Sequence, residues 1–163
     1  MVRWMLNRFF GLLYLFFIIP QCVGQTKIKI GSHQDVLDSY LELCNALADS
    51  NLKNGLSYSQ ITQNEIVKNR LQNQFTAYLI ACTTANSISE LRKSVLVISK
   101  LFRQVLPFSE SLEEEIFVVY SLKAFQGDGA MWLTNNKKLR NPYYRNSKDD
   151  SCKIGETIRP MVK

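Results

Sequence analysis

The sequence contains a single histidine, His33, and it has neither a glycine-rich phosphate loop nor a His-Glu metal motif. Histidine-based catalytic and zinc sites need further ligands or bases at a fixed spacing, so this scarcity argues against both. We expect His33 to lie at the surface. The three acids at 113–115 are typical of a solvated segment rather than of an acid–base pair. The protein is therefore not expected to be an enzyme.

The sequence also lacks an apolar run long enough to span a membrane. A spanning helix needs about 20 apolar residues. The run at 9–19 is shorter; it follows a basic segment, ends at a proline and precedes small residues. This order predicts a secretory signal peptide over residues 1–24, cleaved before Gln25. Residues 25–163 then form a single exported, periplasmic helical domain with no spanning membrane segment.

The charge of the chain does not favour a nucleic-acid partner. The formal charge is +6, and loss of residues 1–24 removes two arginines and no acid. Nucleic-acid binding needs basic side chains gathered on one face among aromatic platforms, whereas here they alternate with acids and amides. The basic group Lys137, Lys138 and Arg140 offers some attraction to an anionic membrane, although a solvated turn is the simpler interpretation.

Three stretches carry apolar residues at helical spacing. They cover residues 35–48, 62–85 and 88–106. The polar stretch 50–59 between the first two contains Gly55 as a helix stop. Ser87 with Glu90 three residues later predicts a capping box before the third helix. The predicted fold class is mainly α, an antiparallel bundle of three to four helices.

The C-terminal part is predicted to fold over one end of this bundle as a short extended segment. Residues 116–120 are a β-branched and aromatic run, which favours extended backbone. Gly127 and Gly129 permit a tight turn, and residues 131–133 are expected to begin a short helix. An Asn-Pro pair predicts an ordered turn over residues 140–144.

The cysteines of residues 25–163 fall into two kinds. Cys44 and Cys82 lie on the apolar faces of the first two predicted helices, roughly 20 Å apart in an antiparallel hairpin. That separation is too large for a disulfide, so both are predicted to be core thiols. Cys152 differs because it lies in a polar stretch between Lys148 and Lys153, which is expected to expose the thiol.

A specific pattern runs through the C-terminal residues. It consists of Trp132-Leu133, Arg140-Asn141-Pro142-Tyr143-Tyr144 and Glu156-Thr157-Ile158. The pattern resembles the C-terminal signature of domain of unknown function family 3347, a group of exported proteins found beside or fused to heavy-metal efflux adaptors. Looser matches to that family cover 38–49 and 88–99.

The resemblance implies soft-metal ligands that this chain has lost. Where the family reads Tyr-Cys-Pro-Met-Ala, the chain reads Tyr120-Ser121-Leu122-Lys123-Ala124. A later family motif, Met-Leu-x-Cys-Gly, places its cysteine on Ser151, one position before Cys152. Because Cu(I) selects thiolate and thioether ligands, Cys152 is the remaining metal-ligand candidate, with Met131 and Met161 as further sulfur atoms.

Two functions are compatible with these observations. The resemblance implies an exported accessory of copper or heavy-metal handling that binds Cu or another soft metal weakly or no longer at all, through Cys152. Its expected partner is a periplasmic efflux adaptor or another metal-handling protein. The alternative is a degenerate protein-interaction module with no metal role, which the single plausible thiol favours.

Overall fold

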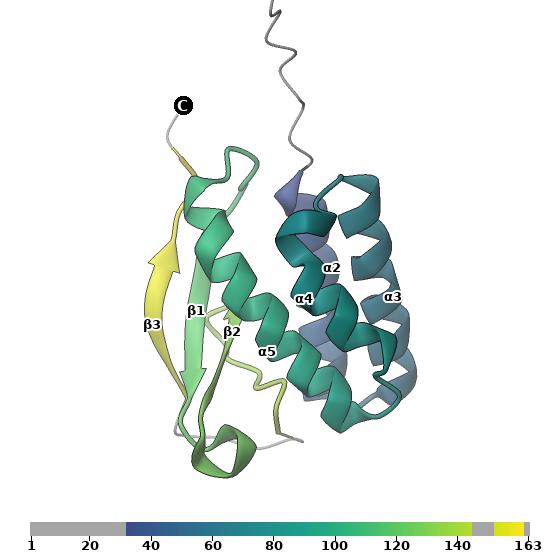
Figure 1. The fold of residues 1–163 in the computed structure, drawn as a ribbon. Helices are drawn as coiled ribbons and strands as arrows, with labels where there is room; N and C mark the ends of the chain where they lie inside the picture. The colour runs from purple at the N-terminus through teal and green to yellow at the C-terminus, as the bar shows by residue number, and fades with distance from the viewer. Residues whose placement is uncertain (1–31, 145–151, 162–163) are drawn as a thin grey trace, which may run out of the picture.

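The computed structural model describes residues 32–144 and 152–161. The predicted signal peptide, Lys148 and Ser151 lie outside the described residues. The described part forms the helices α2 (His33–Ala48), α3 (Leu52–Lys68), α4 (Gln72–Thr83) and α5 (Ile88–Val105), and the strands β1 (Ile116–Ser121), β2 (Ala130–Thr134) and β3 (Cys152–Ile158). The protein is mainly helical, as predicted, with a small sheet added beside the helices (Figure 1).

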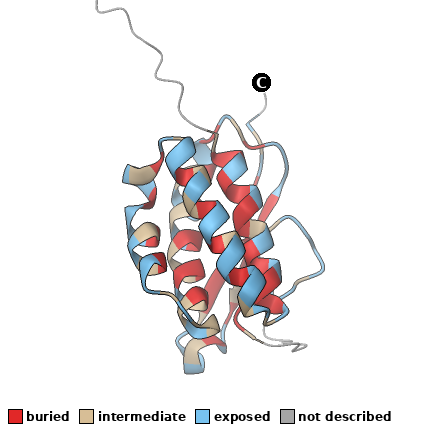
Figure 2. Ribbon diagram, turned by 90° about the vertical axis from the view of Figure 1, so that its right-hand side faces the viewer, coloured by how far each residue is buried: buried red, intermediate tan, exposed pale blue. Residues whose placement is uncertain are grey.

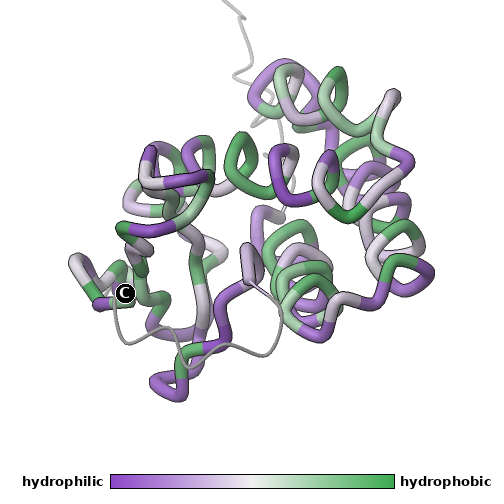
Figure 3. Tube along the Cα trace, turned by 90° about the horizontal axis from the view of Figure 1, so that it is seen from below, coloured by the Kyte–Doolittle hydropathy of each residue, from purple (hydrophilic) through white to green (hydrophobic). Residues whose placement is uncertain are grey.

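The helices pack in two close pairs, α2 with α3 and α4 with α5, and α5 also contacts β2 (Figure 1). Hydrophobic and hydrophilic residues are interspersed along each helix (Figure 3). The apolar residues recur every three or four positions, so each helix buries one stripe and exposes the other side (Figure 2). In α5 the buried hydrophobic stripe consists of Leu91, Val95, Ile98 and Phe102.

The second predicted helix is wrong in its extent, because the chain forms two helices there, and residues 52–59 of the predicted linker belong to α3. The break comes at Arg70, which has a left-handed backbone (φ 59). Its N–H donates to the Val67 carbonyl at 3.1 Å, and the Leu71 N–H donates to the Ile66 carbonyl at 2.9 Å. These are the two hydrogen bonds of a Schellman motif, which usually has glycine at the left-handed position. The sequence therefore carried no glycine signal for this helix end.

Gly55, expected to stop a helix, lies inside α3 instead. A Cβ atom on this residue would approach the side chains of Leu91 at 3.1 Å and Leu47 at 3.3 Å. The glycine therefore allows α3 to pack closely against α2 and α5, which compensates for its low helix propensity.

The predicted start and end of α5 are confirmed. The Ser87 hydroxyl accepts from the Glu90 N–H at 3.3 Å, and the Glu90 carboxylate accepts from the Asn86 N–H at 2.9 Å. The Ser87 hydroxyl also donates to the Glu90 carboxylate at 2.9 Å. The hydrogen bonds to this carboxylate lower the pKa of Glu90, the backbone N–H of Asn86 contributing most. The helix ends at Val105, two residues before Pro107.

The strands form an antiparallel sheet in the order β2-β1-β3. The extended segment predicted at 116–120 is confirmed as β1, whereas the short helix predicted at 131–133 is wrong because these residues belong to β2. Gly127 and Gly129 both have positive φ, as the predicted turn requires, and they return the chain so that β2 pairs with β1. Four of the five β2 residues are buried, so the period-2 alternation that marks a half-exposed strand is absent.

The strand β3 was not expected from the sequence, and it turns the predicted extended segment into part of a sheet. Its pairing with β1 shifts between Val118 and Val119. Gly155 lies at this irregularity, where a Cβ atom would come within 2.5 Å of the Tyr120 ring. Because Gly155 has no side chain, the Tyr120 ring can pack against the backbone of β3 at this position.

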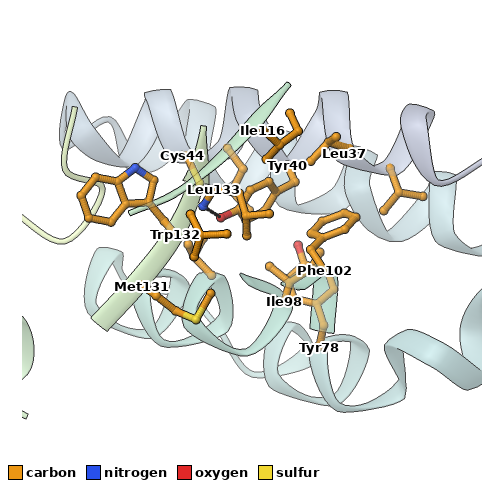
Figure 4. Packing of buried hydrophobic residues seen from close by; sticks show 14 of the residues in the cluster. Leu37, Tyr40, Cys44, Tyr78, Ile98, Phe102, Ile116, Met131, Trp132 and Leu133 are labelled. Atoms are coloured by element: carbon orange, nitrogen blue, oxygen red, sulfur yellow. Dashed lines mark hydrogen bonds between the residues drawn. The ribbon is translucent and has the colours of Figure 1, made fainter. Parts of the chain in front are cut away.

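A buried hydrogen-bond chain joins the helices to the sheet through Tyr40, which is 0% exposed. The Leu133 N–H at the edge of β2 donates to the Tyr40 hydroxyl at 2.9 Å (Figure 4). The Ser99 hydroxyl donates to the Val95 carbonyl at 2.6 Å, so the Tyr40 hydroxyl is the donor in its 2.7 Å contact with Ser99. Burial raises the pKa of Tyr40 well above its ordinary value, which keeps that proton in place.

We expect Tyr40→Phe to lower the free energy of unfolding by about 1–3 kcal/mol, because the Leu133 N–H loses its acceptor inside the core. Chemical denaturation measures the change. Tyr58→Phe is the matched control, since the Tyr58 hydroxyl makes no side-chain hydrogen bond among the described residues and should matter little. Equal stability losses in the two variants would show that the Tyr40 hydroxyl has no special role.

Candidate functional site

Three polar side chains from separate parts of the chain meet at one end of the sheet. Ser121, the last residue of β1, lies directly opposite Cys152, the first residue of β3. The Asn141 amide nitrogen is 3.2 Å from the Ser121 hydroxyl oxygen and 3.3 Å from the Cys152 sulfur. We call this cluster the 121–141–152 corner.

The orientation of Asn141 in this corner follows from its hydrogen bonds. Its side-chain oxygen accepts from the Tyr143 N–H at 2.9 Å, so the two N–H groups of the amide are the ones directed at Ser121 and Cys152. Ser121 is 1% exposed and Asn141 is 7% exposed, whereas Cys152 is half-buried. Cys152 is therefore the most accessible residue of the corner.

The segment that carries Asn141 is anchored on both sides. The Tyr143 hydroxyl donates to the Met131 carbonyl at 2.6 Å, and burial raises the pKa of Tyr143 well above its ordinary value, so the hydroxyl remains a donor. Arg92 in α5 donates from Nε to the Pro142 carbonyl at 2.8 Å. The ordered turn predicted from the Asn-Pro pair is present, and these contacts hold it against the helices and β2.

The structure changes the expected surroundings of Cys152. This residue begins β3 and pairs with Ser121, so the prediction of an exposed thiol in a polar loop is wrong. Lys123 follows Ser121 by two residues, and the Lys123 backbone carbonyl accepts a hydrogen bond from the Tyr144 hydroxyl. The polar sequence around Cys152 did not predict the strand β3, because this strand forms by pairing with β1, which is distant in the sequence.

The two methionines considered as further sulfur ligands do not reach the corner. Met131 lies opposite Tyr120, and neighbouring residues of a strand point to opposite faces, so Met131 is on the other face from Ser121. Met161 follows the far end of β3. Within residues 32–144 and 152–161, no three His, Cys, Asp or Glu side chains gather where a metal ion could be held.

The other two cysteines of the described residues lie in the core, as predicted. Cys44 and Cys82 are free, buried thiols. Burial raises the pKa of Cys44 to about 12, so its thiol is protonated at neutral pH and is not a ready metal ligand.

His33 is buried at 8% exposure, so its predicted place at the surface is wrong. Its Nε2 atom is 2.8 Å from the Gln74 side-chain oxygen, and its Nδ1 atom is 3.2 Å from the Ser109 hydroxyl. The His33 backbone N–H donates to the Ser111 hydroxyl at 3.1 Å. Ser109 is only 3% exposed, so the serine–histidine pair is buried. The Gln74 contact ties the start of α2 to α4, and the serine contacts tie it to the segment that follows α5.

Comparisons with family models, with curated proteins and with solved structures find no match for this chain. The family resemblance thus stays a prediction, and the site has to be judged from its own geometry. Among the described helices, none is long and apolar enough to cross a membrane.

The register at the corner can be tested with Ser121→Cys. Directly opposite residues of an antiparallel pair have Cα atoms about 4.5–5.5 Å apart, which suits a disulfide. Mild oxidation of this variant should join residues 121 and 152 within the chain, seen as protection of both thiols from alkylation in a mass spectrum. Leu122→Cys, one position along and exposed, should not form this bond with Cys152. A register in which residue 122 cross-links as readily as residue 121 would contradict the pairing.

Proposed function

We propose that the protein is an exported, periplasmic accessory domain of the metal-associated kind, in which the soft-metal site is reduced to the thiol of Cys152. The observation that carries this proposal is the pairing of Ser121 with Cys152. The resemblance puts one cysteine ligand at position 121 and another next to position 152, far apart in the sequence. The strand pairing puts Ser121 opposite Cys152, the sequence neighbour of that second position, as a shared ligand site requires.

The chemistry of the corner supports weak metal binding by this chain alone. Cu(I) prefers thiolate and thioether sulfur, while Ser121 and Asn141 supply only hydroxyl and amide groups. One sulfur leaves most of the coordination positions of a soft metal to other molecules. A metal-handling partner, such as a periplasmic efflux adaptor, would then complete the site on Cys152.

The surface beside the corner also supports a protein partner. Leu122 is 60% exposed and Ile154 is 40% exposed, and both lie within two positions of a corner residue. A contiguous patch of exposed apolar side chains marks an interaction site, and these two are the exposed large apolar residues nearest the corner in the sequence. The same surface supports the second candidate function, a protein-interaction module with no metal role, in which Cys152 is only part of the contact.

Cu(I) titration against a competing chelator, with a reductant that is not a thiol, separates the two functions. Ser121→Cys should raise the Cu(I) affinity at least about tenfold, because it adds a second thiolate opposite the first. A further Cys152→Ser change should remove that gain. The matched control is Thr157→Cys, which adds a thiol to β3 away from Cys152, opposite Phe117.

The outcomes bear directly on the proposal. Submicromolar Cu(I) binding by the parent chain that survives Cys152→Ser would mean that the ligands lie elsewhere. Equal affinities for Ser121→Cys and Thr157→Cys would show that the corner is not a reduced metal site, and the interaction module would then be the better account.

A further inference from the structure

A cavity of about 70 Å³, lined by none of the three corner residues, lies between α2 and the turn that follows β2. Leu41, Cys44 and Trp132 contribute apolar surface to its wall, and Figure 4 shows Cys44 and Trp132 beside Leu133. A water molecule occupies about 30 Å³ of liquid, so the space suits a group of a few heavy atoms rather than a nucleotide or a peptide.

The buried part of this wall carries no negative charge. Cys44 is 5% exposed, and burial holds its pKa near 12, so the thiol is neutral at physiological pH. The other lining residues are apolar, amide, hydroxyl or basic, and no carboxylate is among them. An anion entering the cavity would therefore meet no like charge in its lining.

The outer wall supplies positive charge and hydrogen-bond donors. Lys138 and Arg140 both line the cavity, and Arg140 forms an ion pair with Asp49. Lys138 has no ion pair with any residue in the described part of the chain, so its charge is available to a ligand. Asn45 and Asn136 add two amide groups, and the Asn136 side-chain oxygen accepts from the Lys138 N–H at 2.8 Å, which leaves the amide N–H groups as donors.

We propose that this cavity binds a small oxyanion, with Lys138 supplying the charge and the Asn45 and Asn136 amides supplying hydrogen bonds. A hydrogen bond to a charged group is the stronger kind, and here it combines with a partly enclosed space whose accessible surface is mainly polar. A metal cation is disfavoured by the same two basic side chains. This inference does not depend on the metal role of the 121–141–152 corner.

Trp132 provides a direct reporter, because the chain has two tryptophans and the other is Trp4. In a Trp4→Phe chain, we expect the fluorescence of Trp132 to change saturably with inorganic phosphate or with acetate. Chloride at matched ionic strength is the reference. A stronger response to acetate would identify carboxylates as the preferred oxyanion, and a stronger response to phosphate would identify phosphate groups.

The lysine pair offers a matched control. Lys138→Gln should weaken the response about tenfold or more, since a charge-assisted hydrogen bond is lost. Lys137→Gln should leave it unchanged, because Lys137 lies 5.6 Å from the Phe117 ring centre and does not line the cavity. Both lysines are exposed, so neither change should impair folding. A response shared by chloride, or lost equally in both variants, would overturn the proposal.

Discussion

The hydroxyl group of Tyr40 is the contact on which the rest of the structure depends. It lies in the core, accepts from the Leu133 amide in β2 and donates to Ser99 in α5. A buried hydroxyl without partners costs free energy, whereas here both its donor and its acceptor capacity are used. The contact links α2, α5 and β2, and it pairs one backbone N–H on the outer edge of β2 that the sheet itself leaves unpaired.

Both candidate sites follow from this arrangement. A second tyrosine, Tyr143, accompanies Tyr40 at the same edge by donating to the Met131 carbonyl. Its backbone holds the Asn141 side chain, which reaches the thiol of Cys152. The residues between β2 and Tyr143 also form the basic wall of the oxyanion cavity. One anchored segment thus connects the edge of the sheet to the corner and to the cavity.

Local signals in the sequence predicted the local parts of the fold. The capping box of α5 and the β-branched run of β1 involve neighbouring residues, and both are confirmed. The helix end at Arg70 was missed because a residue other than glycine adopts the left-handed conformation there. For the candidate site, Cys152 was named from the family resemblance, but its pairing with Ser121 depends on a sheet register that no local pattern encodes.

Native-state hydrogen exchange of the Leu133 amide tests the central claim most directly. This amide belongs to an edge strand, where the outward N–H groups usually exchange quickly with solvent. If Tyr40 holds α2, α5 and β2 together, the Leu133 amide should exchange only with global unfolding, at the same free energy as the most protected amides of α5. Exchange of the Leu133 amide at the rate of an exposed loop would contradict the account.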